Sequence, residues 1–197
     1  MENEKLFSIL ICTLAKRQKM FKILYSVLEV QAKCCGVENQ IEILSVVDNG
    51  KMPVGKKRNI LISMSKGKFI AFVDDDDRVN SNYIKIITNI IKTNPDIDCI
   101  GMTGIYTTDG KDPKKFIHTL NCKEYFEKDG IYYRCPNHLN PIRRDCIKDI
   151  KFDEINFGED AKWAFKIRDK NLLKKEVMYD QDPLYYYRFS RSVTATQ

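Results

Sequence analysis

The chain lacks long hydrophobic runs, metal-ligand histidine spacing and any stretch typical of nucleic-acid binding. Its first apolar run covers only residues 6–14 and is interrupted by Ser8 and Thr13, which favours a core strand over a signal peptide or membrane span. The two histidines, His118 and His138, have no zinc-site spacing. No arginine-rich arm or zinc-finger pattern is present, so we expect no nucleic-acid partner.

Paired cysteine motifs are also missing. The seven cysteines are odd in number and scattered, and no two form a C-x-x-C pair. Most of them lie among apolar residues, which favours reduced, buried thiols over a disulfide framework. We therefore predict a reducing compartment and a cytoplasmic location.

The composition is that of one globular domain with a sizeable core. The chain has 197 residues, of which 43% are hydrophobic and 30% charged. The net charge of +6 comes from lysines and arginines spread along the chain. Such a balance is compatible with an anionic small substrate or with peripheral association with an acidic membrane surface.

Strand-like runs and helical periodicities alternate over the first half of the chain. The expected strands are 6–13, 41–47, 69–73 and 98–104, and the expected helices are 20–32, 55–65 and 80–93. Four residues would form the buried face of the first helix: Phe21, Leu24, Val27 and Leu28. Gly67 would end the second helix as a C-cap. The alternation predicts an α/β fold, a Rossmann-like three-layer αβα sandwich with a mostly parallel central sheet.

The second half is less regular. Asp109-Gly110 and Asp129-Gly130 have the chemistry of hairpin turns. Strand-like segments at 116–118 and 131–133 flank them, and the pattern continues with a helix at 160–168 and a late strand at 185–188.

Four consecutive carboxylates, Asp74 to Asp77, follow the apolar run 69–73. Charges this close repel one another and need a cation or protonation to compensate them. Because side chains alternate along an extended segment, Asp74 and Asp76 would share one side, and Asp75 and Asp77 the other. One pair could hold Mg²⁺ or Mn²⁺, which prefer hard oxygen ligands. The alternative is a solvated acidic turn that caps the next helix.

Two further clusters carry polar chemistry. If Asp160 opens a helix, Trp163, Ala164 and Ile167 share its face, and desolvation would raise its pKa toward that of a general base. The alternative is a carboxylate that stabilises the helix N-terminus. The basic run 55–59 begins a helix and could contact a phosphate or base, although such runs are usually solvated.

Taken in order, these segments resemble the signature segments of family 2 glycosyltransferases with the GT-A fold. The matching segments are 6–13, 46–50, 55–59, 65–77 and 157–160. A D-x-D alone is a weak match, but its ordered association with the other segments is specific and spans almost the whole chain. The resemblance implies one domain, 1–197, with a nucleotide-sugar-binding half at 1–104 and an acceptor-side half at 105–197.

The resemblance also implies roles for the donor side. Thr13 and Asp48 would lie against the nucleotide base, with Arg58 near the base and phosphates. Asp74 would face the ribose or a metal-bound water, and Asp76 would bind the metal, Mn²⁺ or Mg²⁺, that bridges the diphosphate. Asp48 favours uridine, because it could accept a hydrogen bond from the ring N–H.

On the acceptor side, the resemblance assigns the catalytic base to Asp160, with Glu159 beside it.

Three further residues would bind the donor. Asp75 would belong to the donor-binding loop, His138 would approach the donor sugar, and Arg188 would lie in a tail that folds over the diphosphate. Residues 190–192 belong to the same tail, and the basic residue expected after the first strand could be either Lys16 or Arg17.

The implied activity is metal-dependent, inverting transfer from a nucleoside-diphosphate sugar to a hydroxyl of a glycan or other acceptor. Two alternatives are a nucleotidyltransferase of related fold and a catalytically inactive sugar-binding protein. A third is a phosphatase of the haloacid dehalogenase type, because Asp75-x-Asp77-x-Val79 matches its nucleophile loop.

Overall fold

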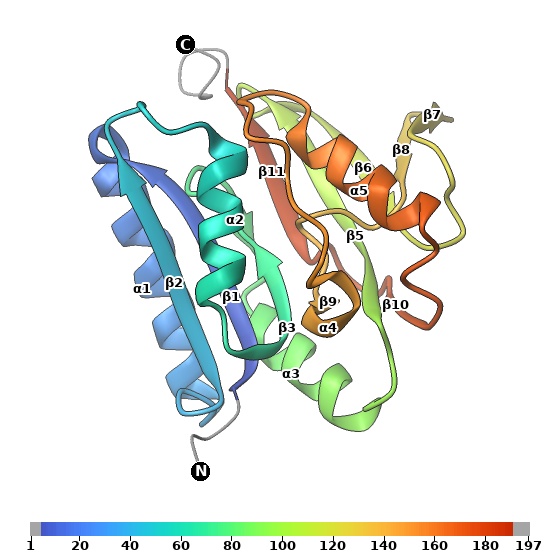
Figure 1. Cartoon of the computed structure of the whole chain (residues 1–197), viewed down its shortest axis with the longest axis horizontal. Coiled ribbons are helices and arrows are strands. Elements are labelled where there is room, and N and C mark those ends of the chain that lie inside the picture. The colour runs from blue at the N-terminus through green and yellow to red at the C-terminus, as the bar shows by residue number, and fades with distance from the viewer. Residues whose placement is uncertain (1–4, 191–197) are drawn as a thin grey trace.

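A parallel arrangement of β1, β2 and β3 forms the N-terminal part of the central sheet (Figure 1). The computed structural model describes residues 5–190. Its first elements are β1 (Lys5–Leu14), η1 (Ala15–Arg17), α1 (Gln18–Cys34), β2 (Ile41–Asp48), α2 (Val54–Met64), β3 (Gly67–Phe72), β4 (Arg78–Val79) and α3 (Tyr83–Thr93). The remaining elements are β5 (Cys99–Thr108), β6 (Lys111–His118), β7 (Phe126–Lys128), β8 (Ile131–Arg134), β9 (Ile142–Arg143), α4 (Arg144–Ile147), α5 (Glu159–Asp169), β10 (Glu176–Tyr179) and β11 (Tyr185–Phe189).

The sheet has the order β2-β1-β3-β9-β5-β6-β8-β7, with β10 and β11 also paired to β5. The short strand β9 runs antiparallel to both β3 and β5, so β5 points the same way as β1, β2 and β3. Both β10 and β11 run parallel to β5. The sheet is therefore mostly parallel, as predicted, with antiparallel pairing at β4, β6, β7 and β9.

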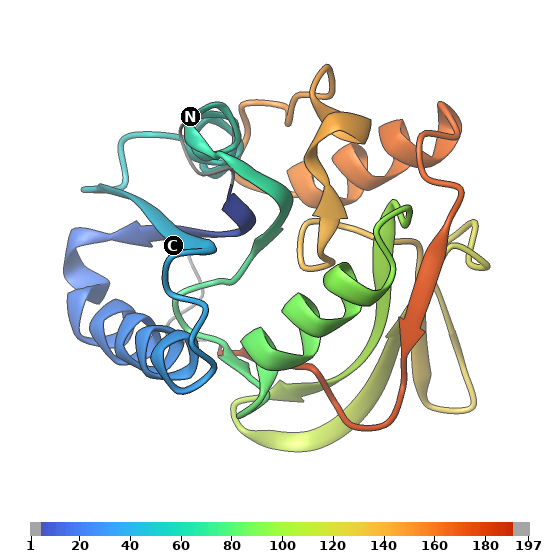
Figure 2. The same ribbon diagram turned by 90° about the horizontal axis from the view of Figure 1, so that it is seen from below.

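Helices cover both faces of this sheet (Figure 2). Alternate residues of β1 point to opposite sides: Phe7, Ile9 and Ile11 pack with α1 and α3, whereas Leu10 packs with α2, α4 and α5. Burial on both faces explains why the first strands read as nearly continuous apolar runs. The arrangement confirms the three-layer α/β fold.

Two details of the first half differ from the prediction. Helix α2 ends at Met64, and Gly67 opens β3 instead of capping the helix. A Cβ at Gly67 would collide with the backbone of Ser8, so close approach of the two strands requires this glycine. Val27 is 43% exposed, because α1 packs on the sheet through the neighbouring row of Leu24 and Leu28.

Both predicted hairpin turns are present. Asp109-Gly110 joins antiparallel β5 and β6, and Asp129-Gly130 joins antiparallel β7 and β8. All four residues have positive φ, between 50° and 75°, as two-residue turns of the I′ type require. The short strands β4, β9 and β10 were not predicted. Within residues 5–190, no helix combines the length and the apolarity needed to cross a bilayer.

Candidate active site

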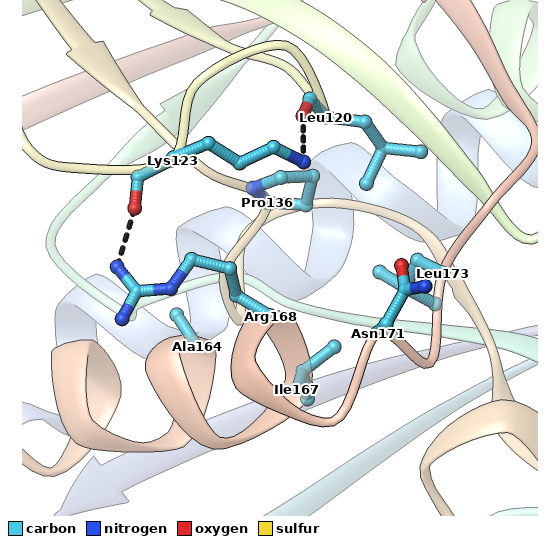
Figure 3. A pocket seen from close by; sticks show the side chains of 8 residues that line it. All are labelled: Leu120, Lys123, Pro136, Ala164, Ile167, Arg168, Asn171 and Leu173. Atoms are coloured by element: carbon cyan, nitrogen blue, oxygen red, sulfur yellow. Dashed lines mark hydrogen bonds between the residues drawn. The ribbon is translucent and has the colours of Figure 1, made fainter.

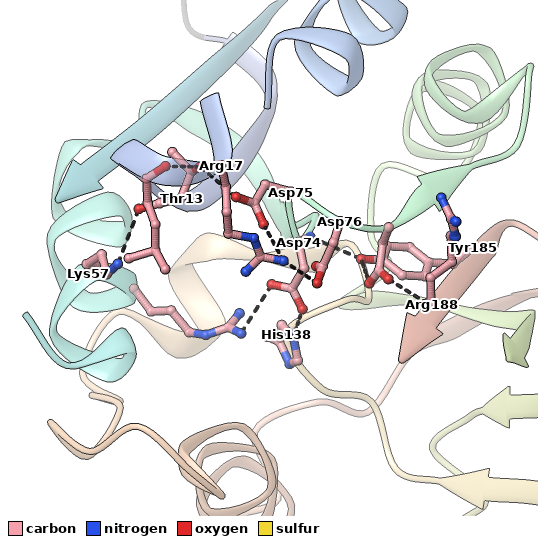
Figure 4. A network of polar contacts seen from close by, with 12 residues as sticks. Thr13, Arg17, Lys57, Asp74, Asp75, Asp76, His138, Tyr185 and Arg188 are labelled. Atoms are coloured by element: carbon pink, nitrogen blue, oxygen red, sulfur yellow. Dashed lines mark hydrogen bonds and ion pairs between the residues drawn. The ribbon is translucent and has the colours of Figure 1, made fainter. Parts of the chain in front are cut away.

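The carboxyl ends of β1, β2 and β3 bring polar side chains to one edge of the sheet, where ligands of open α/β folds bind. Lys57, which is buried on α2, joins two of these ends (Figure 4). Its Nζ donates to Asp48 Oδ1 at 2.6 Å and to the Thr13 carbonyl at 3.3 Å. Burial alone would raise the pKa of Asp48, but the hydrogen bond from Lys57 and that from the Met52 N–H hold it below its usual value. The sequence interpretation included Lys57 only as part of the basic run 55–59 and did not predict its contact with Asp48.

Burial divides the acid cluster into two pairs, but the predicted extended segment is wrong, because residues 74–77 form a turn in which the Asp77 N–H donates to the Asp74 carbonyl at 3.1 Å. Asp75 and Asp77 are only 3% and 6% exposed, and the chain itself satisfies them. Thr13 Oγ1 donates to Asp75 Oδ2 at 2.6 Å. The Tyr185 hydroxyl and the Arg188 backbone N–H each donate to Asp77 at 2.7 Å. Only the backbone N–H of Arg188, which lies in β11, reaches the cluster, and its side chain is exposed (Figure 4); its predicted place over a diphosphate stays a prediction.

Asp74 and Asp76, the other pair, are more open and face cations. Arg58 Nη2 lies 3.4 Å from Asp74 Oδ1, and Arg17 pairs with Asp76 and, at 3.1 Å, with Asp75. Of the two basic residues that could follow β1 in this role, Arg17 is the one that contacts the acid cluster, whereas Lys16 is exposed. Burial raises the pKa of Asp76, helped by the Asp74 charge. For Asp74 burial acts in the same direction and is the largest single effect, yet Arg58, His138 and Arg17 together outweigh it and hold the pKa low.

The donor atoms of Asp74 and Asp76 suit a divalent ion that a ligand helps to coordinate. No group of three or more histidine, cysteine or carboxylate side chains within residues 5–190 is arranged to hold a metal. Mg²⁺, however, commonly takes one or two carboxylates and completes its shell with water and phosphate oxygens. The pair therefore fits a metal shared with a diphosphate, for which Arg17 would have to release Asp76. We call the nine residues of this region the charged edge: Thr13, Arg17, Asp48, Lys57, Arg58, Asp74, Asp75, Asp76 and Asp77.

Helix α5 begins at Glu159, directly after Gly158, whose φ of 71° is left-handed. Glu159 is buried and its Oε1 lies 3.3 Å from Arg58 Nε. Burial raises the pKa of Glu159. The pKa of Asp160 is lowered, so the predicted rise is wrong. Burial does favour a rise, but the charges of His138 and Arg58 outweigh it, since Asp160 faces them and not the core beneath α5.

His138 connects the charged edge to α5. Its Nε2 lies 3.7 Å from Asp74 Oδ2 and its Nδ1 lies 3.9 Å from Asp160 Oδ2. The side chain is 4% exposed, and neither ring nitrogen has a hydrogen-bond partner within the described part of the chain. Its carbonyl accepts from the Phe72 N–H at 2.8 Å, which fixes His138 beside the end of β3.

A cavity of about 260 Å³ opens beyond His138 and Asp160; we call it the aromatic cavity. Its lining residues are Tyr106, Phe116, His118, Tyr132, Arg134, Asn137, His138, Leu139, Asp160, Tyr187 and Phe189. Most of these come from β5, β6, β8 and β11, and the sequence interpretation placed only His138 and Asp160 in the site. The aromatic run at 185–187 was the one sequence feature that could have indicated it.

A second hollow, between α5 and the segment after β6, measures only about 20 Å³ (Figure 3). Lys123 Nζ donates to the Leu120 carbonyl at 3.2 Å, and Arg168 donates to the Lys123 carbonyl. This space has room for about one water molecule. It carries no candidate chemistry.

Comparison with known proteins identifies the family. Residues 9–152 match the family described as Glycosyl transferase family 2. The chain belongs to this family. Minor teichoic acid biosynthesis protein GgaB of Bacillus subtilis (strain 168) is 27% identical to this family 2 chain over 143 residues, covering 68% of the chain and 15% of GgaB.

Solved structures show the same fold. S. aureus TarS 1-349 superposes on this family 2 chain with a TM-score of 0.64 at 17% identity, covering 93% of the chain and 60% of TarS 1-349. The structure of TarS 1-349 in complex with UDP-GlcNAc matches with the same TM-score, and the present chain covers 58% of it. These matches confirm the GT-A fold. The chain spans only part of the length of each of these relatives.

The predicted roles of the site residues stay predictions, although the structure brings most of them together. The described residues end at 190, so Arg191 and Ser192 of the predicted tail lie outside them.

Proposed function

We propose that this family 2 chain transfers a sugar from a nucleoside-diphosphate sugar to an acceptor hydroxyl. The position of His138 carries the proposal: it lies within 4 Å of both Asp74 and Asp160, at 3.7 and 3.9 Å. The carboxylates assigned to the donor and the carboxylate assigned to the acceptor therefore face one site. A diphosphate would lie on the charged edge and the acceptor in the aromatic cavity.

On the donor side, Thr13 and Asp48 would flank the nucleotide base. Both Asp48 oxygens already accept hydrogen bonds, from Lys57 and from the Met52 N–H, so Lys57 would fix the carboxylate against the base. UDP-sugars are the first donors to test. Asp48 favours uridine, and the related fold of TarS is known with UDP and with UDP-GlcNAc.

Asp76 and Asp74 would hold Mn²⁺ or Mg²⁺. When bound, such an ion neutralises negative charge that develops on a departing diphosphate. Arg17 forms ion pairs with Asp76 and Asp75. Its Nε is buried and has no hydrogen-bond partner within residues 5–190. A diphosphate would offer Arg17 the oxygen acceptors that this nitrogen lacks.

Asp160 would act as the general base. Its lowered pKa keeps it ionised at neutral pH, so Oδ2 can take the proton from the attacking acceptor hydroxyl. Attack on the anomeric carbon from the side opposite the leaving diphosphate predicts inversion. Glu159 would position Arg58 through their buried ion pair, without touching the acceptor.

The position of Asp75 does not support the phosphatase alternative. Asp75 would have to be that nucleophile, but it is buried, accepts a hydrogen bond from Thr13 and pairs with Arg17. The cytoplasmic location and the peripheral membrane association stay predictions.

A thermal-shift screen tests the proposal, because a ligand that binds only the folded state raises apparent stability. Nucleoside-diphosphate sugars are added with Mn²⁺ to the wild type and to Asp76→Asn. We expect UDP-sugars to raise the melting temperature of the wild type. The additional rise that Mn²⁺ produces should be much smaller in Asp76→Asn. Failure of every nucleotide-sugar to stabilise the wild type would contradict the proposal.

A further inference from the structure

The aromatic cavity is separate from the charged edge. Asp160 and His138 form part of its wall, whereas none of the nine residues of the charged edge lines it. A group in this cavity would therefore meet the proposed base without lying among the residues assigned to the nucleotide. The cavity has the position expected for an acceptor.

Tyrosines supply flat walls to the cavity. The rings of Tyr106 and Tyr187 stack with centroids 5.4 Å apart and an interplanar angle of 10°, and Tyr132 meets Tyr106 edge-on at 5.7 Å. Aromatic walls with a few fixed polar groups are typical of small-molecule sites. A ring with apolar C–H faces and polar edges, such as a pyranose, matches these walls.

His118, at the end of β6, is the most completely defined polar group of the cavity. Asn140 Nδ2 donates to the Ile100 carbonyl at 2.9 Å, and Asn140 Oδ1 accepts from the Asn137 N–H at 3.0 Å. The Asn140 amide is therefore oriented with its oxygen toward His118 Nδ1, 2.9 Å away. Because that oxygen can only accept, His118 Nδ1 must carry the proton.

The second ring nitrogen of His118 is therefore a hydrogen-bond acceptor. Burial, helped by the charge of Arg134, lowers the pKa of His118 to about 3, so the ring is neutral at physiological pH. Nε2 then bears a lone pair and has no hydrogen-bond partner in the described ranges of the chain. The ring is 1% exposed and lines the cavity.

Arg134 offers the opposite polarity on the same wall. Its guanidinium lies over the Tyr125 ring at 5.1 Å and forms no ion pair with a carboxylate of residues 5–190. Beside the carboxylate of Asp160, the cavity thus presents a neutral acceptor of fixed direction, His118 Nε2, and the donor group of Arg134 to a ring that lies against the tyrosines.

We propose that the aromatic cavity is the subsite for a hydroxylated sugar ring of the acceptor, and that His118 Nε2 selects it by accepting a hydrogen bond from one of its hydroxyls. This assignment rests on the proposed glycosyltransferase function. His118 is a specificity-determining residue here, while Asp160 takes the proton in the reaction.

Two substitutions separate this role from a structural one. In His118→Asn, the side-chain amide can still donate to Asn140 Oδ1 but nothing replaces Nε2. In His118→Gln, the longer amide can place its oxygen near the position of Nε2 but loses the bond to Asn140. A purely structural histidine would tolerate His118→Asn better than His118→Gln, and the proposal predicts the reverse order for sugar binding.

The probes are methyl glycosides of glucose, galactose and N-acetylglucosamine, titrated into the full chain labelled with ¹⁵N-histidine. At least one should shift the His118 Nε2 resonance. Its affinity should fall about 3- to 10-fold in His118→Asn, the size of one neutral hydrogen bond, and less in His118→Gln. Unchanged affinity in His118→Asn, or no glycoside that shifts Nε2, overturns the proposal.

UDP titrated in the presence of Mn²⁺ provides the internal control. It should bind the wild type and both variants equally, because His118 does not line the charged edge. If UDP binds but no glycoside does, the cavity assignment fails while the proposed function stands. If neither UDP nor any other nucleoside diphosphate binds the wild type, the proposed function itself fails.

Discussion

The charged edge and the aromatic cavity meet at His138 and Asp160, but they are built from opposite kinds of side chain. The edge holds its charges in pairs, among them Lys57 with Asp48 and Arg58 with Asp74. The cavity instead contains a neutral, buried histidine, His118, among tyrosines.

This difference separates the two substrates by chemistry. Paired charges near an exposed sheet edge can exchange partners when a charged ligand arrives, as Arg17 would when a diphosphate and a metal bind. A cavity with aromatic walls and a hydrogen-bond acceptor of fixed direction suits an uncharged ring, because it offers shape and a few directed contacts.

Asp160→Asn acts at the junction of the two regions. The amide cannot accept the proton of the acceptor hydroxyl, so turnover should fall about 10²- to 10⁴-fold, the usual contribution of a general base. Binding of a UDP-sugar with Mn²⁺ should be unchanged, as measured by titration calorimetry. Near-normal turnover in this variant would remove Asp160 as the base.

Arg58→Met tests the pairing within the charged edge. Arg58 is fully buried between Asp74 and Glu159, and removing it leaves both carboxylates without their cation. The free energy of unfolding should fall by about 3–5 kcal/mol, measured by urea denaturation. Adding Glu159→Gln should recover part of this loss. Equal stability of Arg58→Met and the wild type would show that the buried ion pair is not formed.

Acid should destabilise the protein partly through His118. Its pKa is about 3 in the folded protein against an ordinary 6.5, so below about pH 6.5 the unfolded chain binds a proton that the folded chain excludes. This contribution removes about 1.4 kcal/mol of stability for each pH unit of further acidification toward the folded pKa. His118→Asn should show a shallower decline, measured by urea denaturation between about pH 6.5 and 4.5. Identical declines in the two proteins would mean that His118 is not held neutral.

Tyr187→Leu should have the smallest effect. It removes the stacked contact with Tyr106, which we expect to cost about 0.5–1.5 kcal/mol of stability beyond lost apolar burial. Binding of methyl glycosides should weaken, while binding of UDP should not change. Weaker UDP binding in Tyr187→Leu would show that the two regions are not separate.

The sequence predicts where the charged edge lies, because several of its residues follow recognisable local patterns. Asp48 and Asp74 each end an apolar strand, and parallel strands bring such ends together. Arg58 lies in a short basic run at the start of a helix, and Asp160 lies one residue into another. The alternation of apolar runs and helical periodicities likewise predicts the layers of the fold.

The aromatic cavity could not be predicted in the same way. Tyr106, His118 and Tyr187 come from β5, β6 and β11, and their approach depends on the parallel pairing of β11 with β5 across about eighty residues. The pKa of Asp160 was predicted in the wrong direction for a related reason. Helical spacing identifies the apolar residues that share a face of α5 with Asp160. It cannot show that His138, from another segment, lies next to the Asp160 carboxylate.

The anomeric configuration of the released sugar shows whether Asp160 activates an oxygen that attacks opposite the leaving diphosphate. UDP-GlcNAc, in which the sugar is α-linked, is incubated with the chain and Mn²⁺, and the first-formed product is observed by ¹H NMR. Direct displacement assisted by Asp160 predicts that β-configured N-acetylglucosamine appears first. Initial formation of the α-anomer would contradict a mechanism in which Asp160 activates an attacking oxygen on the face opposite the diphosphate.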